Sequence, residues 1–256
     1  MRCEGMNADW VLETRGLAKE FKGFTAVAGV DLQVRRGSIH ALIGPNGAGK
    51  TTVFNLLTRF IEPSRGAIFY NGQDITRRSA AQVARMGMVR SFQISAVFPH
   101  LTARENLLVP LQRASGASYH FWRSRRQIDR RLDERARQLL DEVDLGGFAD
   151  VVAAELPYGR RRALELATTL AVSPEVLLLD EPTSGMGHED IGRVAELIRR
   201  VARQRTVLMV EHNLGLVANL SDRITVLQHG SVLAEGSYAE VSRDARVMEA
   251  YMGKAA

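Results

Sequence analysis

Apolar residues in the N-terminal third of the chain follow the period of β-strands, apart from one helical stretch. Alternating or continuous apolar residues occupy three early runs and predict strands. These runs are Val11–Arg15, Ala26–Val34 and Ser38–Ile43. The glycine-rich residues 44–49 predict a turn, and Thr52–Phe60 then has apolar residues at helical spacing. Ala67–Tyr70 predicts a strand that enters a hairpin turn at Asn71-Gly72.

The pattern changes to one of helices after about residue 95. Residues 101–170 are mostly helical in period and rich in Arg, Glu and Asp, with a small-residue break at Ser115–Ser118. Strand-like runs then return, with helical patterns between them. The runs are Val176–Leu179, Thr206–Val210 and Ile224–Leu227, and the helical stretches are Ile191–Arg203 and Leu214–Leu220. A β-rich start, a helical insert and a βαβ finish predict an α/β core with a helical subdomain.

Composition narrows the class of protein without choosing a function. With 256 residues, 45% of them hydrophobic and 25% charged, the chain can bury a core of ordinary size. The net charge of +5 suits a polyanionic partner, such as nucleotide phosphates, nucleic acid or an anionic membrane surface. The single cysteine, Cys3, excludes an intrachain disulfide and agrees with a reducing cytosol.

The sequence offers no segment suited to entering a membrane. Glu4 and Asp9, with no apolar run beside them, predict that the N-terminus is not a secretory signal. A helix that spans a bilayer needs about 18 or more consecutive apolar residues, and no such run occurs. Any role at a membrane must therefore come from docking onto other subunits.

One motif predicts a phosphate-binding loop. The pattern G-x-x-x-x-G-K-[ST] is matched by Gly44-Pro45-Asn46-Gly47-Ala48-Gly49-Lys50-Thr51, which follows the apolar run Ile39–Ile43 and opens a helix. The glycines let several backbone N–H groups converge on phosphate oxygens, and the helix start adds a favourable dipole. Lys50 would supply charge to the β- and γ-phosphates, and the hydroxyl of Thr51 would bind Mg²⁺. The competing interpretation is a chance glycine turn before a helix.

Two acids follow the apolar run Val176–Leu179. Four apolar residues in a row are typical of a buried parallel strand, and open α/β sheets bind ligands at the C-terminal ends of such strands. Asp180 would hold Mg²⁺ directly or through water, and Glu181 would polarise the attacking water. The alternative is a strand that ends in an acidic turn without a catalytic role.

Two further polar residues are weaker candidates on their own. Gln93 could give its amide oxygen to Mg²⁺ or water, although, taken alone, an exposed polar residue without a role explains it better. His212, after the run Thr206–Val210, could donate a hydrogen bond to a γ-phosphate. A helix-capping or satisfied loop histidine is the alternative.

The order of these motifs resembles the ATP-binding-cassette family of transporter ATPases over residues 11–253. The resemblance implies one ATP-binding domain with an α/β P-loop NTPase core, at about 11–93 and 171–236, whose parallel sheet carries an N-terminal antiparallel β subdomain. It further implies a helical subdomain at about 94–170 and a C-terminal tail at 237–256. ATP and Mg²⁺ are the implied cofactors.

The same resemblance implies roles for individual residues. Glu181 becomes the catalytic base, Gln93 the glutamine that binds metal beside Thr51 and Asp180, and His212 the switch histidine. Phe21 matches the aromatic that stacks on adenine, with a core phenylalanine as the alternative. The other implied nucleotide-binding residues are Val27, Gly44, Pro45, Asn46, Gly47, Ala48, Gly49, Lys50, Thr52, Leu156 and Gly159.

The signature segment of the family, usually Leu-Ser-Gly-Gly-Gln, is altered here. The chain keeps Leu156 and Gly159 but has Pro157 for the serine and Arg160 for the glutamine. Proline has neither a hydroxyl nor an N–H, so one hydrogen bond to the ATP of a partner domain is lost. Arg160 is expected to compensate with its charge. The loop after Pro182 also lacks its usual final aspartate.

Three stretches resemble the ATP-binding subunits of branched-chain amino acid importers. They are residues 87–93, the long insert after residue 108, and the tail from residue 234 to residue 253. Relatives with this tail also import other amino acids, amides, urea or aromatic acids. The resemblance implies a second ATP-binding subunit, more often a different chain than a copy, and separate transmembrane permease subunits. It also implies a periplasmic binding protein as an indirect partner, and a peripheral location on the cytoplasmic face of the cell membrane.

A second function class stays open at this point. Arginines lie beside aromatic residues at 121–126 and recur at 130–131, as in proteins that bind single-stranded nucleic acid. The competing interpretation is a solvated helical face, because Asp129, Asp133 and Glu134 interleave with the arginines. A nucleotide kinase or other P-loop enzyme is a third possibility, which the ordered glutamine, signature position and histidine disfavour. We expect transport, and no nucleic-acid partner.

Overall fold

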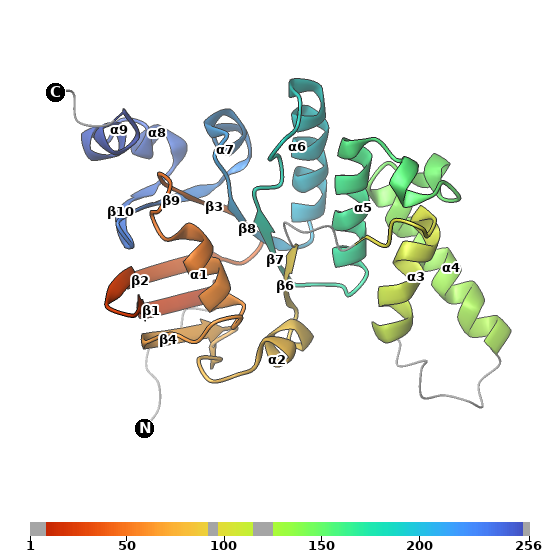
Figure 1. Cartoon of the computed structure of the whole chain (residues 1–256), viewed down its shortest axis with the longest axis horizontal. Helices are drawn as coiled ribbons and strands as arrows, with labels where there is room; N and C mark the ends of the chain where they lie inside the picture. The colour runs from red at the N-terminus through yellow and green to blue at the C-terminus, as the bar shows by residue number, and fades with distance from the viewer. Residues whose placement is uncertain (1–8, 92–96, 115–124, 253–256) are drawn as a thin grey trace. The chain divides into compact units, whose positions relative to one another are not determined.

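Segments that alternate along the sequence build two units in the computed structural model, which describes residues 9–91, 97–114 and 125–252 (Figure 1). The first unit comprises Met1–Arg90, Glu175–Thr183 and Ile198–Ala256. The second comprises Ser91–Pro174 and Ser184–Leu197. The predicted helical subdomain, about 94–170, lies within the span of the second unit, which also includes Ser184–Leu197.

An antiparallel sheet begins the first unit. Its strand order is β2-β1-β4-β5, from β1 (Trp10–Phe21), β2 (Phe24–Arg35), β4 (Arg65–Tyr70) and β5 (Gln73–Asp74). Two-residue turns with positive φ at both positions, Lys22-Gly23 and Asn71-Gly72, join the hairpins and match the right-handed twist of the strands. The strand predicted at Val11–Arg15 extends over the whole of β1. The sequence pattern ended too early because an irregularity at Gly16, with φ 56, interrupts the alternation of apolar and polar residues.

The second sheet is mostly parallel and has the order β10-β9-β3-β8-β7-β6. The strands are β3 (Ile39–Ile43), β6 (Met88–Ser91), β7 (Val176–Asp180), β8 (Thr206–Val210), β9 (Arg223–Gln228) and β10 (Ser231–Gly236). β3 runs parallel to β8 and β9, β7 runs parallel to β8, and β10 is antiparallel to β9. Every residue of β3, β7 and β8 is buried, which explains their continuous apolar runs.

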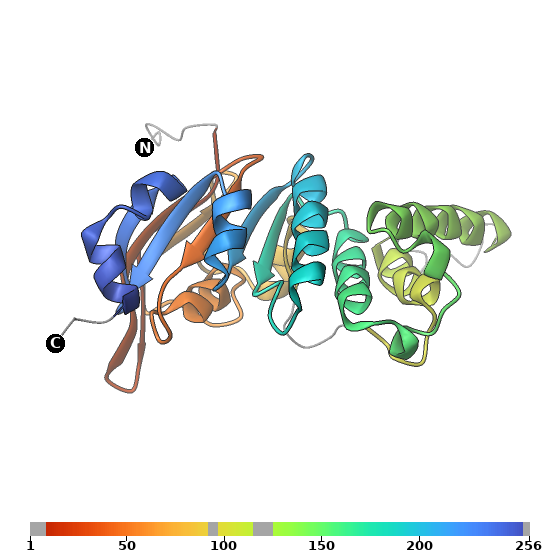
Figure 2. The same cartoon turned by 90° about the horizontal axis from the view of Figure 1, so that it is seen from above.

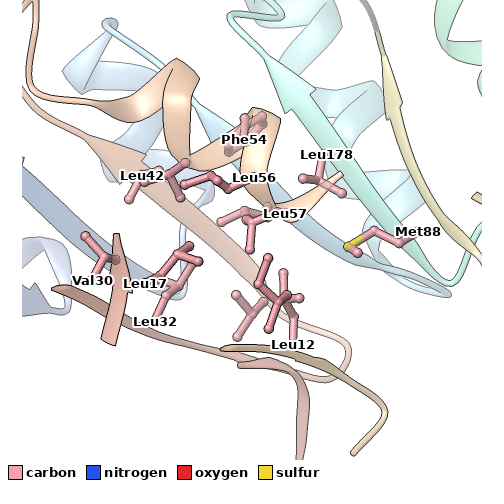
Figure 3. Packing of buried hydrophobic residues seen from close by; sticks show 14 of the residues in the cluster. Leu12, Leu17, Val30, Leu32, Leu42, Phe54, Leu56, Leu57, Met88 and Leu178 are labelled. Atoms are coloured by element: carbon pink, nitrogen blue, oxygen red, sulfur yellow. The ribbon is translucent and has the colours of Figure 1, made fainter. Parts of the chain in front are cut away.

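Helix α1 (Lys50–Leu57) packs between the two sheets, as Figure 3 shows. Its fully buried Phe54, Leu56 and Leu57 join one hydrophobic cluster with residues of both sheets. Leu178 of β7 belongs to that cluster, whereas its buried neighbour Leu177 does not, as expected for successive side chains on opposite faces of a strand. Helix α7 (Leu214–Leu220) lies on the face of the second sheet opposite α1 (Figure 2).

The remaining helices of the first unit are short. They are α2 (Ala80–Arg85), α8 (Tyr238–Val241) and α9 (Ala245–Met252). Ser79 and Gln82 form a capping box at α2, and Ser237 and Glu240 form another at α8, which satisfies N–H groups that have no partner inside a helix. Helices α8 and α9 lie beside β10, the edge strand, so the chain after the last strand packs onto the core.

The second unit is helical in its described part. It contains α3 (Ala103–Ala114), α4 (Arg125–Glu142), α5 (Tyr158–Leu170), the start of α6 (His188–Ala202) and the 3-10 turns Gly146–Phe148 and Ala153–Glu155. Helices α3, α4 and α5 contact one another around buried residues such as Leu107, Leu139 and Leu164. Asp133 on α4 accepts from Arg104 at 2.9 Å and from Arg137 at 3.0 Å. An acid among the arginines of α4 is therefore paired within the unit.

The predicted α/β class with an antiparallel sheet, a parallel sheet and a helical part is confirmed. The helix expected at Thr52–Phe60 begins earlier, at Lys50, and ends at Leu57. The sequence pattern missed β6 and α2, because each has too few residues to establish a period. It also missed β10, which lacks a continuous buried apolar run, since five of its six residues are half-buried. Across the described residues, every helix is too short or too polar to cross a bilayer.

Candidate functional site

The loop between β3 and α1 has the curled backbone that its glycines predict. Gly44, Gly47 and Gly49 have φ of 149, 78 and 99. A Cβ at Gly44 would lie 2.2 Å from the carbonyl oxygen of Leu227, and one at Gly49 would lie 2.6 Å from that of Ala26. Side chains are therefore excluded at these positions by neighbouring backbone as well as by φ.

The loop is also fastened to a second turn that the sequence did not reveal. The N–H of Gly230, in the turn between β9 and β10, donates to the carbonyl of Ala48 at 3.0 Å, and Ala28 donates to the carbonyl of Gly230 at 2.8 Å. Ala48 itself is buried. The outer part of the loop stays accessible, with Asn46, Gly47 and Thr51 exposed and Pro45 and Thr52 half-buried.

Lys50 lies at the start of α1 with its ammonium turned toward the loop. Its Nζ donates to the carbonyl of Gly44 at 2.7 Å and to that of Pro45 at 3.0 Å. Burial lowers the pKa of Lys50, and the nearby carboxylates of Glu181 and Asp180 oppose that shift. The structure thus brings this lysine and both acids together at one edge of the sheet, as the sequence predicted. No side chain caps the N-terminus of α1, so its first N–H groups suit an anion.

Asp180 ends β7 and is almost fully buried. Its Oδ2 accepts a hydrogen bond from Nη2 of Arg90, which lies in β6, and the two form an ion pair. Nη1 of Arg90 donates to Oδ1 of Asn55 on α1 at 2.5 Å. Arg90 also lies over the ring of Phe54, 5.7 Å from its centroid. Sequence analysis assigned no role to Arg90, because its partners lie 35 and 90 positions away.

Glu181 and His212 form a second polar pair. Nε2 of His212 lies 2.8 Å from Oε1 of Glu181, and their side chains are 44% and 23% exposed. Glu181 has φ 48, and its N–H donates to the carbonyl of Val210 at the end of β8. A carboxylate held by an imidazole and open to solvent can take a proton from a water molecule.

A buried acid that the sequence analysis overlooked supports this pair. Glu211 accepts from the N–H and the hydroxyl of Thr183 at 3.0 and 2.6 Å, and from the N–H of His212 at 2.9 Å. It also accepts from the N–H of Asn213 at 3.2 Å, so one carboxylate ties the segments after β7 and β8 together. In the sequence, the only signal for a role of Glu211 was its position directly before the candidate His212.

The two candidates from the antiparallel sheet differ in exposure. Phe21 is 44% exposed beside the hairpin turn, with Nζ of Lys19 5.1 Å from its ring centroid, so the alternative of a core phenylalanine is wrong. Val27 is fully buried, with a methyl group 3.7 Å from where a Cβ on Gly49 would lie. We therefore assign Val27 to support of the loop rather than to direct contact with a nucleotide, which corrects the expectation above.

The second unit holds the signature segment, and Gln93 lies outside the described residues. Leu156 is buried, and Gly159 is near Asp190, whose carboxylate would be 2.8 Å from a Cβ there. Pro157 precedes the first residue of α5 without a side-chain cap. The hydroxyl of Tyr158 donates to the carbonyl of Ser184 at 2.9 Å, which links this segment to the loop that follows Thr183.

Arg160 does not project its charge freely from the signature segment. Its guanidinium carbon lies 3.8 Å from the ring centroid of Phe148, within the same unit, in a cation–π contact. The neighbouring Arg161 donates to the carbonyls of Ala154 and Leu156 at 3.1 and 3.2 Å. The guanidinium keeps its charge in this contact, so compensation by Arg160 for the missing serine stays a prediction.

Comparison with known proteins agrees with the motif order. The family model described as ABC transporter matches residues 27–184, and the model described as branched-chain amino acid ATP-binding cassette transporter matches residues 231–256. A crystal structure described as the ADP conformation of an ATP-binding cassette of an ABC transporter has a TM-score of 0.83 and 28% identity. The alignment covers 96% of this chain and 99% of that one.

Two relatives match over nearly their whole length. The high-affinity branched-chain amino acid transport ATP-binding protein BraF of Pseudomonas aeruginosa is 38% identical over 251 residues, covering 96% of this chain and 98% of BraF. The protein of the same description, LivG, of Escherichia coli is 38% identical over 252 residues, with the same shares. The chain therefore belongs to the ATP-binding-cassette family of transporter ATPases, in its branched-chain amino acid group, and its activity is ATP binding and hydrolysis.

Proposed function

We propose that this chain energises the uptake of branched-chain amino acids, or of related small polar solutes, through separate transmembrane subunits. The observation that carries the proposal is the similarity to BraF and LivG, both named for high-affinity branched-chain amino acid transport, over 96% of the chain. The match of residues 231–256 to the branched-chain amino acid model supports it independently of the ATP-binding motifs.

We assign the chemistry of hydrolysis to three groups of the first unit. The loop from Gly44 to Thr51 holds the triphosphate through its backbone N–H groups and Lys50. Glu181 accepts the proton of the attacking water, and His212, 2.8 Å from its carboxylate, keeps that carboxylate in place. Gln93 joins this assignment on the family resemblance alone, and Phe21 offers an exposed ring on which adenine stacks.

Mg²⁺ fits the donors that this unit presents. The described residues contain no group of three His, Cys, Asp or Glu side chains that could hold a metal by themselves. Mg²⁺ needs no such group, because it binds through one or two protein oxygens together with substrate phosphates and water. Asp180 and the exposed residue Thr51 supply such oxygens. When bound, the ion would neutralise charge on the β- and γ-phosphates.

The altered signature segment has a consequence for the second ATP-binding subunit. We propose that two ATP-binding subunits act together, each presenting its signature segment to the ATP of the other, and that the pair is a heterodimer. Pro157 lacks a hydroxyl for the partner's ATP, so a different second chain with the usual serine would activate the site of this one more strongly. The pair would dock on permease subunits at the cytoplasmic face of the membrane, with a periplasmic binding protein delivering the solute.

Reconstitution tests the proposal. The chain would be purified with its permease subunits and second ATP-binding subunit, placed in proteoliposomes with Mg²⁺ and ATP, and assayed for uptake of labelled leucine, urea and an aromatic acid. We expect ATP-dependent uptake of leucine, absent when this chain carries Glu181→Gln. ATP hydrolysis without uptake of any of these solutes, in a complex that contains all subunits, would contradict the transport assignment.

The nucleic-acid alternative has less support. Both relatives are named as transport proteins. Salt-sensitive binding of single-stranded RNA by the purified chain would revive it.

A further inference from the structure

Arg90 connects the carboxylate proposed to hold Mg²⁺ with helix α1, which begins at the phosphate-binding loop. One guanidinium nitrogen, Nη2, donates to Oδ2 of Asp180, and the other, Nη1, donates to Oδ1 of Asn55 at 2.5 Å. The side chains of Arg90 and Asp180 are 11% and 2% exposed. A planar guanidinium that holds two oxygens in a fixed fork restricts both partners, which a flexible ammonium would not do.

The two cations near this carboxylate have different partners. Arg90 engages Oδ2 of Asp180, and Lys50 donates to the carbonyls of Gly44 and Pro45. Among the described residues, Arg90 is the ion-pair partner of Asp180.

We propose that Arg90 is a positioning residue for Mg²⁺: by holding Oδ2 of Asp180 it fixes the carboxylate and leaves the other carboxylate oxygen for the metal. The proposal rests on the Mg²⁺ site proposed above. Residues that hydrogen-bond a metal ligand fix its orientation, and their removal typically lowers metal affinity about 10- to 100-fold. Arg90 has the geometry of such a residue, because its guanidinium hydrogen-bonds Oδ2 of Asp180.

The experiment measures how much Mg²⁺ strengthens ATP binding. Calorimetric titration with ATP would be done in EDTA and in saturating Mg²⁺, with every variant carrying Glu181→Gln so that ATP is not turned over. The readout is the dissociation constant for ATP in EDTA divided by that in Mg²⁺. A large ratio means that Mg²⁺ strengthens ATP binding. We expect Arg90→Met to lower this ratio by about tenfold or more, while its affinity for ATP in EDTA changes by less than about twofold.

A matched control separates this role from general loosening of the fold. Arg59 is also a buried arginine of the first unit, with Nε donating to the carbonyl of Arg78 at 3.0 Å and an ion pair to Glu62. Arg59→Met should leave the ratio unchanged. An unchanged ratio in Arg90→Met, or an equal fall in Arg59→Met, would overturn the proposal.

A conservative variant covers the case in which Arg90→Met does not fold. Arg90→Lys keeps the charge but cannot hold Asp180 and Asn55 together, so the ratio should fall by less than in Arg90→Met and still by about threefold or more. A ratio equal to that of the parent would count against Arg90. If the parent itself binds ATP equally well with and without Mg²⁺, the Mg²⁺ site is wrong, and that outcome is distinct from a failure of Arg90 alone.

Discussion

His212 and Glu181 face each other at 2.8 Å, at the C-terminal ends of the adjacent parallel strands β8 and β7. The backbone fixes both residues, because Glu181 donates its N–H to Val210 and His212 donates its N–H to Glu211. Both side chains keep exposed surface. The pair is therefore placed to act on a water molecule as one unit.

Replacing the carboxylate should separate binding from hydrolysis. Glu181→Gln keeps the size and the hydrogen bond but cannot accept a proton, so the rate of ATP hydrolysis should fall about 10²- to 10⁴-fold, the range for loss of a general base. ATP affinity should stay within about threefold, because the phosphate-binding loop is untouched. Phosphate release and calorimetry measure the two quantities, and hydrolysis at the parent rate would remove Glu181 from the mechanism.

The effects of replacing His212 and Glu181 on the rate of ATP hydrolysis should not be additive. His212→Ala alone should slow hydrolysis, because the carboxylate of Glu181 loses the group that orients it. Residues that act as a unit give strongly non-additive effects, so the double variant His212→Ala/Glu181→Gln should hydrolyse ATP about as slowly as Glu181→Gln. If the two losses instead multiply in turnover assays, the residues act independently.

The close packing behind the phosphate-binding loop predicts unequal effects of two glycine substitutions. Gly47→Ala places a Cβ at positive φ, at a cost of about 1–2 kcal/mol, but into open space. Gly44→Ala places a Cβ 2.2 Å from the backbone oxygen of Leu227, which must shift β9. Thermal unfolding should therefore show a larger drop in Tm for Gly44→Ala, with ATP affinity reduced at least about tenfold. Equal drops in Tm would mean that β9 shifts without a loss of stability.

Burial of His40 predicts a loss of stability in mild acid. Burial, and secondarily the charge of Arg223, lowers the pKa of His40 from 6.5 to about 3, and its Nε2 lies 2.8 Å from Oγ1 of Thr225. The folded state therefore holds the ring neutral, while the unfolded chain binds a proton below about pH 6.5. This contribution to stability is complete above pH 6.5 and falls as the pH drops toward 3, by about 1.4 kcal/mol per pH unit.

A variant without the titrating ring isolates that effect. Between pH 7 and pH 5 the free energy of unfolding of the parent should fall by about 2 kcal/mol more than that of His40→Gln. Urea unfolding at the two pH values measures both. Identical pH dependence in the two proteins would show that His40 is not kept neutral by the fold.

Sequence analysis predicted the parts of the site whose residues are consecutive in the chain. The loop from Gly44 to Thr51 was found because its motif and the flanking strand and helix are local, and Asp180 and Glu181 because a buried parallel strand reads as a continuous apolar run. Arg90, Glu211 and the turn at Gly230 were missed, because each acts through contacts with segments far along the chain. Such contacts leave no period or spacing to detect.

One expectation was corrected for a similar reason. Val27 was assigned to the nucleotide from the family pattern, and the structure buries it fully. Its position in the motif is local in sequence, whereas tertiary packing decides what its side chain contacts. The contact of Arg160 with Phe148, 12 residues earlier, was likewise not predicted.

The measurement that tests the account most directly is calorimetric titration of the purified chain with ATP in the presence of Mg²⁺, compared with the same titration of Lys50→Ala. We predict saturable binding of one ATP per chain by the parent and loss of tight binding in Lys50→Ala, whose loop keeps its backbone N–H groups but not the ammonium. A parent chain that shows no binding heat across a range of temperatures, or an unaltered affinity in Lys50→Ala, would contradict the assignment of residues 44–51 to the triphosphate.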